Sequence, residues 1–130
     1  MELIKKGTIA LAKGLVFENG EVDRKPCRPA MIAISADSLT GDLYLLALTS
    51  NIHKYEKFQE SYYALLEEDW IDAGLKVPSL INLNKVYRVK SVGEVKGGLR
   101  PTIYKDVIAK LKKYKERYKD DVYEQIKGKL

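Results

Sequence analysis

The sequence has 130 residues, of which 45% are hydrophobic and 32% are charged, with a formal net charge of +5. This composition is typical of one globular domain over residues 1–130, and the single cysteine and single histidine exclude a disulfide framework within one chain and argue against a structural zinc site. No apolar run is long enough to cross a bilayer and the N-terminus lacks the apolar segment of a secretory signal, so we expect a cytoplasmic protein.

Short apolar segments separated by turn signals predict strands through the first hundred residues. These strands are expected at 7–17, 29–35, 42–50, 78–83 and 85–92, with a turn at 18–21, loops at 22–27 and 36–41, and a break at Gly97-Gly98. Segments 29–35 and 42–50 are apolar on both faces, which predicts an antiparallel hairpin at the centre of a barrel or a covered sheet. Segment 54–70 fits a helical stripe and a strand face equally well, and its structure stays open.

The last part of the chain predicts one amphipathic helix over about 102–127, with Thr102 as its N-cap. Its apolar positions recur every three or four residues: Ile103, Val107, Leu111, Tyr114, Tyr118, Val122 and Ile126. Lysines lie largely off this stripe, and this basic surplus favours an acidic partner. The fold class is therefore mainly β with a C-terminal helix (α+β), a small SH3-like barrel over 1–100 closed by the helix.

Polar side chains stand where the two central strands begin and end. Arg28 stands at the start of the first strand, and Thr49 and Ser50 stand at the end of the second. In an antiparallel pair these residues meet at one rim, where a guanidinium and two hydroxyls suit a phosphodiester. The structural alternative is a surface arginine beside a turn.

Three residues just beyond that rim are candidates for proton transfer and RNA contact. His53 is the only imidazole in the chain, and an imidazole is the natural candidate for proton transfer near neutral pH. Lys54 offers a positive charge to a developing oxyanion, and Tyr55 offers a ring for stacking on an unpaired base. The alternative is an exposed histidine and a half-buried tyrosine.

Two asparagines and an arginine further along are candidates for RNA binding. Asn82 and Asn84 alternate with apolar residues, so both amides share one face, where they either contact a base or form a structural amide pair. Arg88 follows in the next expected strand. No phosphate-binding glycine loop, metal-ligand cluster or serine-nucleophile motif is present, so no cofactor or metal is expected.

Short motifs follow one another along the chain: Gly7-Thr8-Ile9-Ala10-Leu11, Arg28-Pro29-Ala30-Met31-Ile32, Leu48-Thr49-Ser50, the segment 50–57, Ile81-Asn82-Leu83-Asn84, and Gly98-Leu99-Arg100-Pro101. In this order and spacing they resemble the PemK/MazF superfamily of toxin ribonucleases, including its ToxN- and CptN-like members. The resemblance covers about residues 7–107.

The resemblance implies a homodimeric SH3-like barrel that cleaves single-stranded RNA without a metal, by attack of the 2′-hydroxyl to give a 2′,3′-cyclic phosphate. It implies that Arg28 stabilises the pentacoordinate phosphate or acts as the acid. Thr49 and Ser50 would donate hydrogen bonds to the phosphate, and His53 or Lys54 would assist proton transfer or neutralise charge. The implied partner is a cognate antitoxin, either a protein or an RNA.

The chain also departs from that pattern. Kid-like members of the superfamily carry an arginine and an aspartate where this chain has Asn82 and Asn84, so the general base stays open. The alternative function is a non-catalytic SH3-like barrel that binds RNA or a protein partner.

Overall fold

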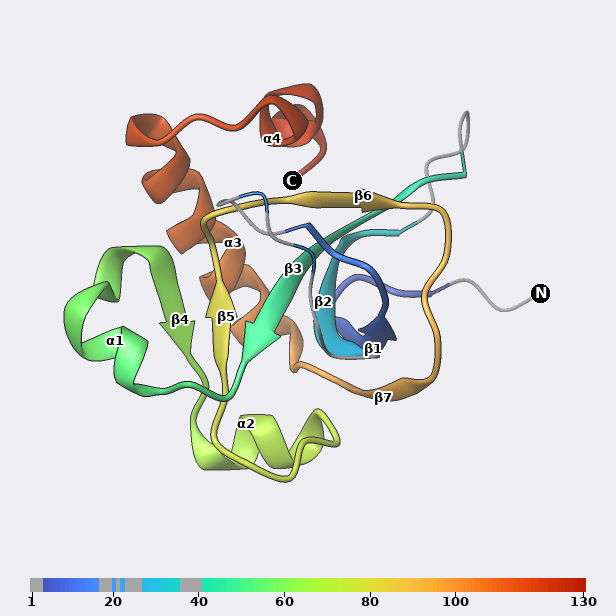
Figure 1. The fold of residues 1–130 in the computed structure, drawn as a ribbon, viewed down its shortest axis with the longest axis vertical. Helices are drawn as coiled ribbons and strands as arrows, with labels where there is room; N and C mark the ends of the chain where they lie inside the picture. Colours follow the sequence, from blue (N-terminus) through green and yellow to red (C-terminus); the bar gives the residue numbers. More distant parts are fainter. Residues whose placement is uncertain (1–3, 17–19, 21, 23–26, 36–40) are drawn as a thin grey trace.

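A computed structural model of the chain describes residues 4–16, 20, 22, 27–35 and 41–130 (Figure 1). Its strands are β1 (Thr8–Ala12), β2 (Arg28–Ile34), β3 (Leu43–Thr49), β4 (Tyr62–Ala64), β5 (Leu80–Asn82), β6 (Tyr87–Val89) and β7 (Val95–Gly98). Its helices are α1 (His53–Lys57), α2 (Glu67–Asp72), α3 (Pro101–Arg117) and α4 (Asp121–Ile126), with 3-10 turns at Gln59–Ser61 and Lys127–Lys129. The mainly β class with C-terminal helices is confirmed. The expected turn at 18–21 and the loops at 22–27 and 36–41 lie largely outside the described residues.

The strands form an antiparallel sheet in the order β4-β5-β3-β2-β1-β7, and β6 also pairs with β3. The predicted central hairpin is confirmed, because β2 and β3 pair with Ala30 opposite Ala47. The first half of β3 pairs with β6 and its last two residues pair with β5. The chain must therefore bend between β5 and β6, at residues 83–86.

Burial on both faces of β3 explains its central place. Leu46 and Leu48 face the larger apolar cluster, which α3 and α4 cover with Val107, Leu111 and other side chains. The alternating residues of β3, led by Leu45, face a smaller cluster on the other side of the sheet. A strand that serves two cores has no solvent face, which is why its sequence shows no polar alternation.

The single helix predicted over 102–127 is wrong, because the structure has two helices with a break at residues 118–120. Asp120 has an extended backbone (φ −139°, ψ 132°), and its carboxylate accepts a hydrogen bond from the Tyr123 backbone N–H, so it N-caps α4. The apolar spacing continues across the break, and spacing alone therefore does not reveal it. Thr102 is not the N-cap either: Arg100 holds that position and Pro101 occupies the first turn, where its fixed φ suits a helix start.

The predicted chain break at Gly97-Gly98 is also wrong, because both glycines belong to β7 and pair with β1. Gly97 is required by its proximity to α2. A Cβ on Gly97 would lie 2.5 Å from the carbonyl oxygen of Asp72 and 2.7 Å from the carbonyl carbon of Ala73. Only glycine allows the strand to approach the end of α2 so closely.

Segment 54–70, left open by its sequence, contains both kinds of structure. It runs through α1, a 3-10 turn, β4 and the start of α2. None of the helices in the described part of the chain has the length and apolarity that a membrane crossing requires.

Candidate functional site

The structure places Arg28 and Thr49 at the same end of the central hairpin. Ala30 lies opposite Ala47, and extending this antiparallel register by two residues sets Arg28 opposite Thr49. Residues directly opposite each other in antiparallel strands point to the same face of the sheet, so the side chains of Arg28 and Thr49 share a face. Arg28 Nη1 donates a hydrogen bond to the carbonyl oxygen of Leu48 at 3.0 Å, which orients the guanidinium along the end of β3.

The chain turns sharply after Thr49 and presents hydroxyl groups at the turn. Thr49 Oγ1 accepts a hydrogen bond from the Asn51 N–H at 3.2 Å, and the Ser50 carbonyl accepts one from the Ile52 N–H at 2.9 Å. Because the Thr49 hydroxyl is an acceptor in this turn, its own proton remains available to donate. Ser50 is exposed. The hydroxyls are thus positioned by the backbone turn that ends β3.

His53 and Lys54 begin α1, one turn of chain beyond this strand end. The Lys54 N–H donates to the Asn51 carbonyl at 3.2 Å, which brings α1 directly onto the turn. Both side chains are exposed. Tyr55 is half-buried and its ring centroid lies 5.4 Å from the ammonium of Lys110, so it packs toward α3 rather than toward Thr49.

A pocket of about 230 Å³ opens beside Thr49 and Ser50. Two lysines line it, and nothing in their sequence positions predicts that they lie beside these hydroxyls. Lys76 comes from the loop after α2, and Lys96 comes from β7. No carboxylate lines this pocket. Lys96 Nζ also lies 3.5 Å from Glu94 Oε2. Two lysines next to two hydroxyls suit a phosphate group.

Asn82 and Asn84 hold the bend between β5 and β6. The backbone N–H and the side-chain Nδ2 of Asn84 both donate to Asn82 Oδ1, each at 2.8 Å. Tyr114 Oη donates to Asn84 Oδ1 at 2.6 Å, and Lys115 Nζ donates to the Asn84 carbonyl at 2.7 Å. This arrangement corresponds to the structural amide pair that the sequence left open, and it fastens the bend to α3.

Arg88 is not brought to the strand end. It lies opposite Tyr44, in the first half of β3, whereas Thr49 is the last residue of that strand. Its Nε is 3.9 Å from the buried carboxylate of Asp42, which also pairs with Lys90 at 2.6 Å. Across the described ranges, no group of three or more His, Cys, Asp or Glu side chains is arranged to hold a metal ion.

No protein-family model and no curated protein matches this sequence. Among solved structures, the chain is similar to one described as an endoribonuclease in complex with its cognate antitoxin from mycobacterial species. The TM-score is 0.60 and the sequence identity 14%, over 88% of this chain and 94% of the other. At this identity the likeness establishes a shared fold.

Proposed function

We propose that this protein is the toxin of a toxin–antitoxin pair and that it cleaves single-stranded RNA without a metal ion. The observation that carries the proposal is the meeting of Arg28 and Thr49 at one end of the β2–β3 hairpin. The fold shared with an endoribonuclease supports it. We further propose that the fold is a small SH3-like barrel over residues 1–100, that the protein acts in the cytoplasm as a homodimer, and that a protein or RNA antitoxin restrains it.

In the proposed reaction the 2′-oxygen forms a bond to the adjacent phosphorus and the bond from phosphorus to the 5′-oxygen breaks. The products are a 2′,3′-cyclic phosphate and a 5′-hydroxyl. Negative charge develops on the non-bridging oxygens of the phosphate. The guanidinium of Arg28 and the hydroxyl proton of Thr49 stabilise that charge, and such preorganised donors supply the largest part of catalysis in many enzymes.

In this proposal, two residues at the start of α1 move protons. His53 and Lys54 are one turn from Thr49, and one of them takes the proton of the 2′-hydroxyl while a second group returns a proton to the leaving 5′-oxygen. Lys76 and Lys96 line the adjoining pocket and bind a neighbouring phosphate of the substrate. In this scheme Asn82 and Asn84 take no part in proton transfer, because their amides maintain the bend between β5 and β6.

The test is incubation of the purified protein with a long single-stranded RNA in EDTA, followed by mapping of the ends. We expect discrete cuts with cyclic phosphate ends, and their loss in Arg28→Ala. Arg88→Ala is the matched control, since it removes an arginine of β6 that pairs with the opposite end of β3. Intact RNA that is still retarded on a gel would instead favour the non-catalytic RNA-binding barrel.

A further inference from the structure

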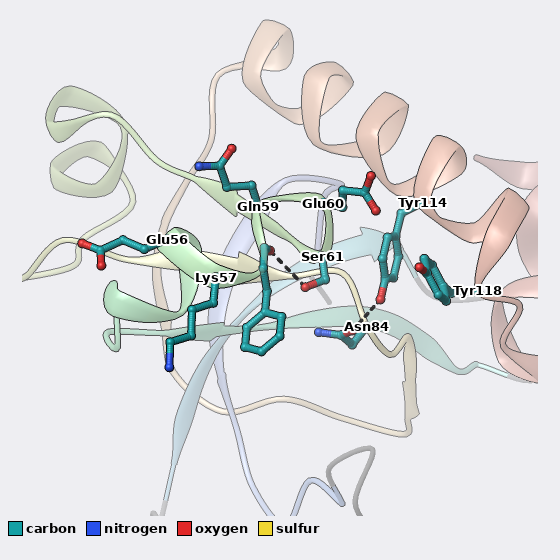
Figure 2. A pocket seen from close by; sticks show the side chains of 9 residues that line it. Glu56, Lys57, Gln59, Glu60, Ser61, Asn84, Tyr114 and Tyr118 are labelled. Atoms are coloured by element: carbon teal, nitrogen blue, oxygen red, sulfur yellow. Dashed lines mark hydrogen bonds between the residues drawn. The ribbon is translucent and has the colours of Figure 1, made fainter.

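An aromatic pocket of about 510 Å³ lies between the segment 56–61 and the C-terminal end of α3 (Figure 2). Its apolar lining consists only of aromatic rings, those of Phe58, Tyr114 and Tyr118. The remaining lining residues are polar or charged. The pocket is separate from the strand-end pocket beside Thr49, with which it shares no lining residue.

The rings of this pocket are open to a ligand. Tyr114 and Tyr118 lie with their centroids 4.8 Å apart and their planes tilted by 30°, as Figure 2 shows at the end of α3. Tyr118 is 51% exposed and Phe58 is 56% exposed. Large aromatic side chains usually bury most of their area, so this exposure is unusual for a small domain. The break between α3 and α4 produces it, because Tyr118 leaves the buried stripe there.

The side-chain amide of Asn84 lines the pocket and has a second hydrogen-bond donor. Asn84 points toward Tyr114 and accepts its hydroxyl proton (Figure 2). One Nδ2 proton of Asn84 is donated to Asn82 Oδ1. The second Nδ2 proton has no acceptor among the described residues. Gln59 also lines the pocket, but Figure 2 shows its amide directed away from Asn84. The rings and the Asn84 amide together suit a flat heteroaromatic ligand that both stacks and forms hydrogen bonds along its edge.

The position of the pocket relates it to the strand-end site. Helix α1 leads from the turn after Thr49 to Lys57 at the edge of the pocket, a length of about 8 Å. Lys54 and Lys57 are exposed along this helix, which also carries Glu56. On α3, Arg117 lies 3.6 Å from Glu60, a lining residue of the pocket. The two lysines of α1 lie between the two sites, where cations suit a chain of phosphates.

We propose that this aromatic pocket binds an unpaired base of the RNA whose phosphodiester is cleaved at the Arg28–Thr49 end. The inference rests on the proposed ribonuclease function and names a subsite for it. A protein helix fits less well, because helix-binding grooves present aliphatic side chains for several apolar anchors, and none lines this pocket.

The experiment measures binding of fluorescently labelled 2′-O-methyl RNA, which 2′-hydroxyl attack cannot cleave, to the full-length protein. We expect Tyr118→Ala to weaken binding by about 5- to 150-fold, the range for loss of one stacked base, and Tyr118→Trp to retain it. Ile71→Ala is the matched control, because Ile71 is 52% exposed on α2. Thermal unfolding of each variant shows that the fold is intact.

Abasic substitutions identify the base. Moving one abasic site along the RNA should reveal a position where the base matters for the wild type and no longer matters for Tyr118→Ala. Two results would overturn the base subsite: an unchanged affinity of Tyr118→Ala, or a loss of affinity in Tyr118→Ala that is the same for intact RNA and for every abasic RNA. Cleavage by the wild type would in that case still support the proposed function. A wild type that neither binds nor cleaves RNA would overturn both.

Discussion

Replacing Asp120 by alanine is expected to lower the free energy of unfolding by about 3–5 kcal/mol, far more than an ordinary surface substitution. Asp120 joins three elements. Its carboxylate accepts hydrogen bonds from the Val86 N–H at 2.8 Å and the Tyr123 N–H at 3.0 Å, and it lies 3.2 Å from Lys115 Nζ. The side chain of Lys115 is only 1% exposed. Removal of Asp120 therefore takes a carboxylate away from a buried ammonium ion.

The magnitude follows from these contacts. Loss of an N-cap side chain costs about 1 kcal/mol, and removal of one partner of a buried ion pair costs about 3–5 kcal/mol. Lys115 keeps its hydrogen bond to the Asn84 carbonyl, so the two terms do not add in full. Lys115→Met should cost less, about 1–3 kcal/mol, because Asp120 retains two backbone donors and is 14% exposed.

The assay is urea unfolding at neutral pH for the wild type, Asp120→Ala, Lys115→Met and the double variant. Asp121→Ala is the matched control, since Asp121 is exposed and adjacent. We expect the double variant to be more stable than Asp120→Ala alone, because it no longer buries an ammonium ion from which the Asp120 carboxylate has been removed. A loss below about 1 kcal/mol in Asp120→Ala, or a larger loss in Lys115→Met, would refute the reasoning.

The same carboxylate gives the stability a defined dependence on pH. Burial raises the pKa of Asp120, but the hydrogen bonds from the Val86 and Tyr123 N–H groups and the charge of Lys115 outweigh it, so the pKa falls below its ordinary value. A carboxylate whose folded-state pKa is depressed stabilises the protein above its unfolded pKa, and that stability is lost as the pH falls through the folded value. The wild type should therefore lose stability below about pH 4 more steeply than Asp120→Asn.

Three further predictions concern the α2 contact and the strand end. Gly97→Ala should destabilise the protein by about 1–3 kcal/mol, because its Cβ would overlap the end of α2. Gly128→Ala is the control and should leave the unfolding midpoint unchanged, because a Cβ on Gly128 meets nothing within 4 Å. Arg100→Ala should lower the thermal midpoint, since it removes the 3.0 Å partner of the buried Asp69, and Asp69→Asn in the same chain should recover part of the loss. Arg28→Ala should reduce kcat for RNA cleavage by about 10²–10³-fold with little change in KM and in the thermal midpoint. A loss of kcat accompanied by a fall in the thermal midpoint would assign Arg28 to the fold instead.

The sequence was sufficient where burial alone decides the structure. The central hairpin of β2 and β3 could be predicted because both of its faces are buried, so an unbroken apolar run leaves one solution. The first turns of α3 could be predicted for a similar reason, since Ile103, Val107 and Leu111 all face the larger core. The placement of Arg28 near Thr49 followed from the antiparallel pairing of those two strands.

Contacts between distant segments decided the rest. The helix break at Asp120 depends on a hydrogen bond to Val86 in the bend before β6, and no local pattern near residue 120 contains that partner. Gly97 looked like a chain break because its role, admitting the end of α2, exists only once the strand and the helix are packed together.

The candidate site divides in the same way. Local sequence placed hydroxyls and an arginine at a strand end, but Lys76 and Lys96 reach the pocket beside Thr49 from an α2 loop and from β7. Asn82 and Asn84 showed an alternation that fits both a base contact and a structural pair, and only the approach of Tyr114 and Lys115 from α3 revealed the structural contacts of Asn84. Periodicity records which side chains are buried along one element, whereas the partners of a polar group are set by where the chain brings other elements, and that is decided by the tertiary structure.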